Sequence, residues 1–410
     1  LLLSVRSGAA ISMPGAMNTF LNVGLNDEIT ENLSKQFNFG WTSWDCYRRL
    51  LQTWGMSYGL NRNDFDQIMI DYKNKLGKLI LFSVSHAIWV ICILLFIIGA
   101  VFVPGFFKVN NLINVLWGNV SFGFMVLGIF FVFVTGGMDL SIESTFAIAP
   151  IIGAMAMLRW FPEIVSPPAA IIIILLLGCV IGLINASLHV LLGINPFLVT
   201  LGMLIILRGL CAYIIPEGLY YLPEGFIALG NARVFDFPVA VIVFAIAVVA
   251  VFILVNKTEF GRNLYAVGSS EKAAFLFGIN VGRIKTIAFL LAGFFAALGG
   301  LTAAGRMQAI TADMGNGDII TVFAACFLGG MSMSGGKGDI VDLIGSILTL
   351  SMITNVLNLI GVNPFLVKVI YGLILLIAII FANAQQQFRQ KLLLDTYKSM
   401  RQERSVARAS

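Results

Sequence analysis

The sequence has little charge for its length. Charged residues make up only 11% of its 410 residues, against roughly 25% in an average soluble domain. Hydrophobic residues reach 59%, and the mean hydropathy is +0.92. A compact globule of this composition would expose too much apolar surface to stay in water. The composition therefore excludes an ordinary soluble enzyme and predicts an integral membrane protein.

Histidine and paired cysteine are also scarce. The chain has two histidines, His86 and His189, and five scattered cysteines with no Cys-x-x-Cys pair. This odd count and spacing argue against a disulfide framework, and neither histidine has a metal-ligand neighbour. We therefore expect no metal site. No signal peptide is visible in the sequence, and its start at Leu1, without an initiator Met, leads us to expect a truncated start.

Long apolar runs begin after a shift in composition at residues 75–78. Each run has about 20 residues, enough to cross a hydrocarbon core of ~30 Å. We predict an all-α membrane protein of about ten transmembrane helices, preceded by a small non-membrane segment. Gly pairs at 136–137 and 329–330 favour broken helices, and the third, fifth and eighth spans are short or interrupted. The predicted spans are 79–101, 112–134, 140–158, 169–191, 197–215, 238–255, 284–304, 319–331, 340–360 and 365–381.

Basic residues gather in three places: before the first span, in the loop 256–285, and in the tail after residue 381. Loops rich in Lys and Arg stay on the cytoplasmic side. An even number of spans puts all three places on that side together, with both termini cytoplasmic. The net charge of +5 is then explained by topology and not by a nucleic-acid partner.

A nine-residue pattern occurs twice. Leu-Gly-Ile-Asn-Pro-Phe-Leu-Val-Thr at 192–200 returns as Ile-Gly-Val-Asn-Pro-Phe-Leu-Val-Lys at 360–368. Five predicted spans separate the copies, so they would enter the membrane from opposite sides, as in transporters built from two inverted five-helix halves. The alternative is that Asn-Pro simply starts a helix, since Pro suits its first turn. Both interpretations stay open at this point.

Asp139 and Glu143 lie within an apolar region, in the run 135–144. An acid at membrane depth is costly and normally faces a bundle interior, a cavity or an aqueous boundary. One interpretation is a part in gating or in the solute pathway, shared with Asn195, Phe197 and Thr200 of the first repeated pattern. The other is capping, with Asp139 at the positive N-terminus of the next helix.

The cytoplasmic stretch 261–280 predicts a short amphipathic helix. Glu271, Ala273, Ala274 and Gly278 combine charge with small residues that would let another surface approach closely. The interpretation we favour is a docking helix; the alternative is a solvated connection. Small residues also recur at helical spacing at Gly293, Ala296, Ala297, Gly299 and Gly300, which predicts close helix packing.

Residues 330–337 partly match the motif of a phosphate-binding loop, but two positions differ from it. The first glycine position holds Met331, and Gly338 follows Lys337 where Ser or Thr is required. The chain is therefore expected to bind no nucleotide there, and energy would have to come from a partner.

The membrane part, about 78–383, resembles the permease subunits of bacterial ABC importers for ribose and related sugars. The resemblance rests on Gly-Gly-Met-Asp-Leu-Ser at 136–141, on Asn-Pro-Phe-Leu-Val-Thr-Leu-Gly at 195–202 with Arg208-Gly209, on Gly-Arg at 261–262 through Gly-Ile-Asn at 278–280, and on 328–338. One departure is Glu143, where such permeases usually have Gly.

The resemblance implies a set of partners and a location. A second permease copy or paralogue, a cytoplasmic ATPase docking on 271–280 and an extracytoplasmic solute-binding protein would assemble in the bacterial inner membrane. ATP would bind the ATPase, and this chain would hold no cofactor of its own. A self-sufficient channel or secondary carrier is the rival within membrane transport.

The first 75 residues resemble a different family. Ser-Val-Arg-Ser-Gly-Ala at 4–9, Ser-Met-Pro-Gly at 12–15 and Trp-Asp-Cys-Tyr-Arg-Arg at 44–49 are similar to the nucleotide-binding domain of pyruvate, phosphate dikinase. The resemblance implies an ATP-phosphate contact for Arg6. The rest of that enzyme's machinery is absent, so we expect an inactive remnant; a membrane-tethered phosphotransferase is the enzyme rival. The predicted domains are 1–77, 78–383 and a basic tail, 384–410.

Overall fold

The computed structural model describes residues 87–363, 365–367, 369–377 and 380, and before them three short stretches, 3–6, 19–23 and 30–31. The chain divides into two units, Leu1–His86 with Asn383–Ser410, and Ala87–Ala382. In the first unit, strand β1 (Leu3–Arg6) pairs antiparallel with β2 (Thr19–Val23), and Arg6 lies opposite Thr19. The predicted domain boundaries at 77 and 383 stay predictions.

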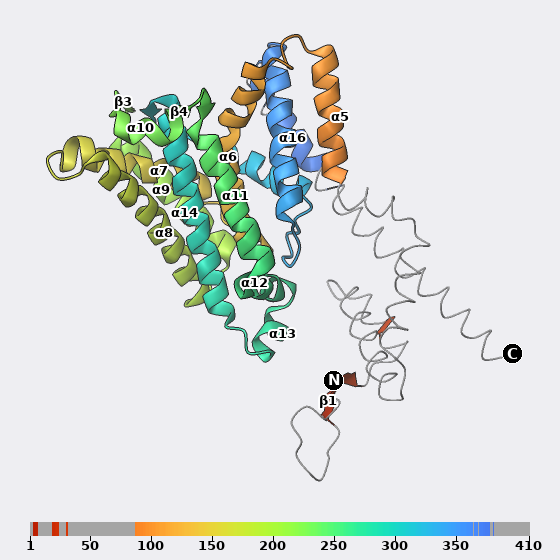
Figure 1. Cartoon of the computed structure of the whole chain (residues 1–410). Coiled ribbons are helices and arrows are strands. Elements are labelled where there is room, and N and C mark those ends of the chain that lie inside the picture. Colours follow the sequence, from red (N-terminus) through yellow and green to blue (C-terminus); the bar gives the residue numbers. More distant parts are fainter. Residues whose placement is uncertain are drawn as a thin grey trace. The chain divides into compact units, whose positions relative to one another are not determined.

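The second unit is a helical bundle (Figure 1). Seven helical segments in the described part of the chain are long and apolar enough to cross a membrane. They are α6 (Val109–Val134), α7 (Ile142–Met155) continued by the π-helical turn η1 (Ala156–Trp160), α8 (Pro167–Val190), α9 (Pro196–Ile214), α11 (Val239–Lys257), α14 (Val281–Met307) and α16 (Ile340–Leu359).

Three of the ten predicted spans correspond to shorter apolar helices: α5 (Ala87–Phe102), α15 (Asp318–Leu328) and Phe365–Ile377. Residues 79–86 of the first predicted span, and 368, 378, 379 and 381 of the last, lie outside the described residues. Helix α15 has only 11 residues, because Gly317 before it and Gly330 beyond its end take positive φ angles of 84° and 76°. The interruption predicted at the second Gly pair is thus present, and the predicted start at 319 is one residue late.

The bundle has two distinct ends (Figure 1). One, called here the β3 end, carries helix α10 (Glu224–Asn231) and two small strand pairs, β3 (Leu219–Tyr220) with β6 (Ala309–Ile310) and β4 (Arg233–Val234) with β5 (Phe237–Pro238). The other, called the α12 end, carries α12 (Glu259–Ser269) and α13 (Glu271–Leu276). The purely all-α prediction missed these two-residue strands, which lie in the connections between helices.

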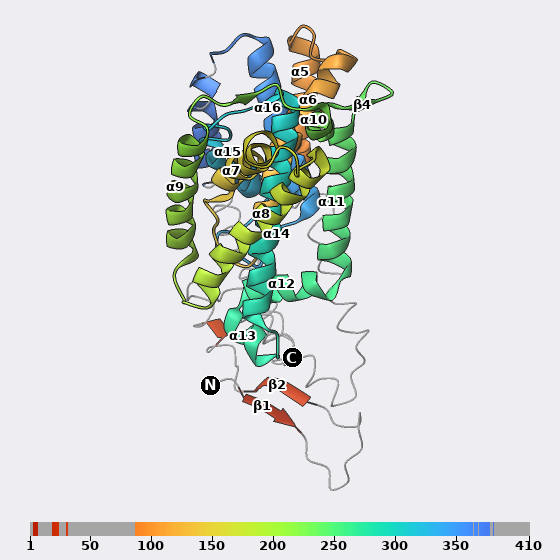
Figure 2. The ribbon, with the colours of Figure 1, turned by 90° about the vertical axis from the view of Figure 1, so that its left-hand side faces the viewer.

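Helix α14 runs through the middle of the bundle (Figure 2). Its small residues pack directly on backbone: a Cβ added to Gly293 would lie 2.0 Å from the carbonyl oxygen of Gly178, and one on Gly182 2.2 Å from that of Phe289. Helices can approach this closely only where no side chain intervenes. The predicted packing role of the small-residue run in α14 is confirmed.

Candidate functional site

Three glycine-bearing segments meet at the α12 end. A Cβ on Gly268 of α12 would lie 1.7 Å from the carbonyl oxygen of Val134, and one on Gly335 would lie 2.6 Å from the Gly136 nitrogen. The Gly336 N–H donates a hydrogen bond to the same Val134 oxygen, at 2.8 Å. The segments that carry the family resemblance, far apart in the sequence, therefore form one close-packed junction. We call these five residues the glycine junction.

Asp139 lies in the connection between α6 and α7, just beyond this junction, and only 2% of its surface is exposed. Its Oδ1 accepts hydrogen bonds from the Ser141 backbone N–H at 2.9 Å and from the Ser141 hydroxyl at 2.6 Å. The Ser141 oxygen accepts in turn from the Asn185 amide at 2.8 Å. Burial raises the pKa of the Asp139 carboxyl to about 6, although both Ser141 hydrogen bonds act to lower it.

The carboxylate of Asp139 thus lies at the start of α7, where Ser141 is the N-cap residue. A negative charge is stabilised there by the unpaired N–H groups of the first turn. The hydrogen bonds of Asp139 go only to Ser141, the N-cap residue itself, and not to an N–H group of the first turn. Its capping role and its part in gating both stay predictions.

Glu143 begins the same helix and reaches a second one. Its Oε2 accepts hydrogen bonds from the backbone N–H groups of Gly317 and Ile319, both at 3.1 Å. These are the N-cap and second residues of α15. Because the first N–H groups of a helix have no partner within it, Glu143 supplies from α7 the cap that α15 lacks. The side chain that departs from the family pattern therefore has a structural role.

Arg208 of α9 completes this arrangement. Its Nη2 lies 3.5 Å from Oε1 of Glu143, and its Nη1 donates to the carbonyl oxygens of Ala312 and Met314, at 3.1 and 3.0 Å. The pair joins α7, α9 and the segment leading into α15. Arg208 belongs to one of the family motifs but was not among the predicted site residues. An arginine inside an apolar run was itself the signal that could have found it.

The three candidates of the first repeated pattern lie differently from one another. Asn195 is the exposed N-cap of α9 and accepts from the Phe197 N–H at 2.9 Å. Phe197 is 42% exposed, whereas Thr200 is fully buried and donates to the carbonyl oxygen of Pro196 at 2.8 Å. Only Thr200 comes near the Asp139 connection, since its hydroxyl also lies 3.3 Å from the carbonyl oxygen of Met138.

The second copy of the pattern makes the same cap. Asn363 accepts from the Phe365 N–H at 2.9 Å, as Asn195 does from Phe197. The first copy follows α8 at the α12 end, and the second follows α16 at the β3 end (Figure 2). The Asn cap at a helix start is therefore enough to explain both copies of the pattern. The two copies lie at opposite ends of the bundle, as two inverted halves would require, but the inverted halves stay a prediction.

The stretch 271–280 forms α13 and a turn at Gly278, whose φ is +80°. Glu271 makes an ion pair with Lys285 of α14 at 2.7 Å. Ala274 is 2% exposed and packs inward, while Ala273 is exposed. The outward surface is therefore not one of small residues, as the sequence led us to expect. It carries large apolar side chains that are 71–83% exposed: Phe275, Leu276 and Phe277.

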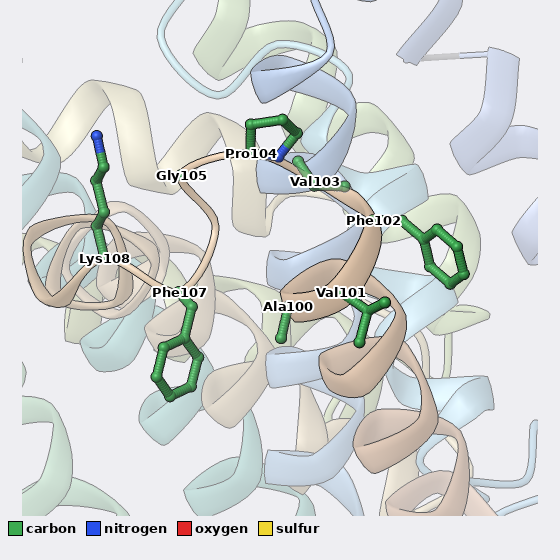
Figure 3. A pocket seen from close by; sticks show the side chains of 8 residues that line it. All are labelled: Ala100, Val101, Phe102, Val103, Pro104, Gly105, Phe107 and Lys108. Atoms are coloured by element: carbon green, nitrogen blue, oxygen red, sulfur yellow. The ribbon is translucent and has the colours of Figure 1, made fainter.

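Two further features lie apart from this site. A hollow of about 380 Å³ is lined by residues 100–105, 107 and 108 at the turn between α5 and α6, and none of Asp139, Glu143 and Arg208 lines it (Figure 3). The ATP contact implied for Arg6 falls on a side chain outside the described part of the chain. Among the described residues, no group of three or more His, Cys, Asp or Glu is placed to hold a metal.

Seven helices long and apolar enough to cross a membrane, with an acid–arginine pair largely buried among them, are typical of a multi-span membrane transport protein. Residues 111–379 match the family described as "Branched-chain amino acid transport system / permease component", and the chain belongs to this family.

Curated relatives carry more specific names. The chain is 33% identical over 303 residues to the galactose/methyl galactoside import permease protein MglC of Escherichia coli (strain K12), covering 67% of this chain and 87% of that one. It is 35% identical over 308 residues to the L-arabinose transport system permease protein AraH of the same strain, covering 75% and 92%. It is 32% identical over 288 residues to the ribose import permease protein RbsC of the same strain, covering 69% of this chain and 88% of that one. No solved structure matches the chain.

Proposed function

We propose that this chain is the permease subunit of an ABC importer for a small sugar or a related polar solute. The solute class is supported by relatives named for galactose, L-arabinose and ribose. The transport cycle would be driven by ATP bound to a partner ATPase. A second permease copy or paralogue and an extracytoplasmic solute-binding protein would complete the assembly in the bacterial inner membrane.

The observation that carries the coupling proposal is the surface of α13. Three neighbouring large apolar side chains are more than two-thirds exposed there, beyond the ends of the apolar spans. Their backbone is held by the Glu271–Lys285 ion pair and the buried Ala274. Exposed apolar groups on a firmly held element are typical of a protein–protein contact. The ATPase is the partner we assign to this surface.

Contacts between α12 and the glycine junction offer a route for the coupling. Tyr265 of α12 donates a hydrogen bond from its hydroxyl to the carbonyl oxygen of Gly338, at 2.6 Å. Gly268 packs on Val134, one residue before the connection that holds Asp139. A displacement of α13 and α12 by the ATPase would therefore reach the connection between α6 and α7. Asp139 and Thr200 are the gating candidates next to it, and Glu143 acts at the break before α15.

The orientation of the chain in the membrane is proposed from its basic residues. Lys257, Arg262, Lys272, Arg283 and Lys285 lie in or beside the connection that forms α12 and α13, so the α12 end is proposed to face the cytoplasm by the positive-inside rule. Both termini would be on this side. The dikinase-like segment is proposed to take no part in transport.

Reconstitution separates the alternatives. Vesicles carrying the chain with a cognate ATPase and solute-binding protein should take up labelled ribose, galactose or arabinose only when ATP is supplied. Vesicles carrying the chain alone should not. Uptake without the ATPase would favour a channel or a secondary carrier, and tight ATP binding by residues 1–75 would revive the phosphotransferase.

A further inference from the structure

Two arginines at the β3 end converge on one tryptophan. The Arg233 guanidinium carbon lies 5.0 Å from the centre of the Trp117 ring, and that of Arg306 lies 5.4 Å from it. Both distances fall within the range of a cation–π interaction. No motif in the sequence includes these three residues, and the positive-inside rule does not account for two arginines at this end of the bundle.

Each of the three residues is fixed by its surroundings. The Trp117 ring N–H donates to the carbonyl oxygen of Gly230 at 2.8 Å, and Arg306 Nη1 donates to that of Gly118 at 3.2 Å. A Cβ on Gly118 would lie only 3.2 Å from Arg306 Nη2, so a glycine here leaves room for the guanidinium. The backbone of Arg233 is held by the β4–β5 pairing, opposite Pro238, and both arginine side chains are exposed. A strand pairing and two hydrogen bonds thus bring the three residues together at the surface.

The two positive charges lack a negative partner within the described part of the chain. The ion pairs found there involve neither Arg233 nor Arg306. Two guanidinium groups on one ring repel each other unless an anion lies between or beside them. Arginine presents a planar set of donors that matches a phosphate, and the two guanidinium groups keep N–H donors besides the one that Arg306 Nη1 gives to Gly118.

The apolar side chains around the two arginines indicate which kind of molecule would supply a phosphate. Phe235, at the tip between β4 and β5, is 100% exposed and held at a φ of +49°, which a bulky residue rarely adopts. Helix α11 starts directly after this hairpin and exposes Ile242, Ile246 and Val249 along its side. Tyrosine side chains of the kind that mark the depth of a membrane interface are exposed at strand β3 of the same end: Tyr220 and Tyr221. The guanidinium groups therefore lie where an apolar, lipid-facing surface ends.

We infer that Arg233, Arg306 and Trp117 form a binding site for the phosphate of an anionic phospholipid, with Phe235 inserted beside it at the bilayer surface. The guanidinium groups hold the headgroup phosphate, and the indole keeps them apart and oriented. The site anchors the β4–β5 hairpin and the end of α14 to the membrane. It does not depend on the solute carried or on the ATPase.

The test measures lipid retained by the purified full chain. Native mass spectrometry after detergent extraction should detect phosphatidylglycerol bound to the unaltered chain, and about tenfold less, or none, after Arg233→Gln with Arg306→Gln, since two charges at the membrane surface are removed. The matched control, Arg262→Gln with Arg283→Gln, removes two exposed arginines at the α12 end and should keep the lipid. Equal retention by both double variants would overturn the proposal.

A second measurement separates loss of the site from loss of the fold. In detergent without lipid, the Arg233→Gln, Arg306→Gln variant should elute as a single species with a Tm close to that of the unaltered chain. Added phosphatidylglycerol should raise the Tm of the unaltered chain and not that of the variant, because a ligand stabilises only the state that binds it. Phosphatidylcholine should raise neither. If inorganic phosphate alone reproduced the shift, the site would belong to a free anion and the lipid proposal would be wrong.

Discussion

The Glu143 carboxylate lies 3.5 Å from the Arg208 guanidinium, and the same carboxylate caps α15. The Arg208 and Glu143 side chains are only 20% and 6% exposed, so removing one member leaves a largely buried charge without its partner and should destabilise the fold. Glu143→Gln keeps an acceptor for the Gly317 and Ile319 N–H groups but removes the charge. We expect it to lower the Tm in detergent, and Glu143→Ala to lower it further, because the cap is then lost as well.

Three comparisons check this pair. Arg208→Gln should also lower the Tm, and the double variant Glu143→Gln, Arg208→Gln should lose less than the sum of the single changes, because neither charge is then left alone. Glu163→Gln, at an exposed acid, is the matched control and should leave the Tm unchanged. Additive losses would mean that the two side chains do not interact.

Asp139 should give the chain a pH-dependent stability. Its pKa of about 6 in the folded protein lies above the value near 3.9 expected when the chain is unfolded. The folded state therefore binds the proton more tightly, and its stability should rise as the pH falls from about 7 to about 4. The integrated effect is about 2 to 3 kcal/mol.

Thermal unfolding at a series of pH values measures this effect. Asp139→Asn should flatten the profile between pH 4 and 7, while Asp236→Asn, at an exposed acid, should leave it as it was. The titration of all other groups contributes equally to the profiles of the three proteins. An unchanged slope in the Asp139 variant would show that its carboxyl is not responsible.

The coupling element can be tested without disturbing the bundle. Replacing both Glu271 and Gly278, as Glu271→Gln with Gly278→Val, should abolish ATP-driven uptake in reconstituted vesicles while membrane insertion persists. The glutamine loses the ion pair with Lys285, and valine is strained at a φ of +80°. Gly278→Asn, which tolerates this conformation, is the control and should retain uptake. Undiminished uptake in the double variant would rule out the coupling role.

The contact between α8 and α14 should be intolerant of a single methyl group. In Gly293→Ala the new Cβ would meet the Gly178 carbonyl oxygen at 2.0 Å, so the helices must separate. We expect a loss of about 1 to 3 kcal/mol, seen as a lower Tm. Gly202→Ala in α9 has nothing within 4 Å of the new atom and should be neutral or stabilising. Equal Tm values for both variants would contradict the packing.

Much of the fold could be predicted from the order of apolar and polar residues. A run of about 20 apolar residues must cross a bilayer as a helix, since no water is present there to satisfy its backbone. Nine of the ten predicted starts fall within three residues of a described helix start, and the Gly pairs predicted the breaks before α7 and after α15. Asn-Pro at 195–196 set the start of α9 through a cap that involves only neighbouring residues.

What the sequence alone determined about this protein is the part that depends on local chemistry: membrane insertion, helix order, family motifs and the separation of basic from acidic connections. Only the tertiary structure decided which distant groups meet. It paired Glu143 with Arg208 and with the start of α15, brought Gly136, Gly268 and Gly335 into one junction, and placed Arg233 and Arg306 on Trp117. These contacts depend on how the helices pack side by side, and that packing cannot be predicted from the spacing of residues along the chain.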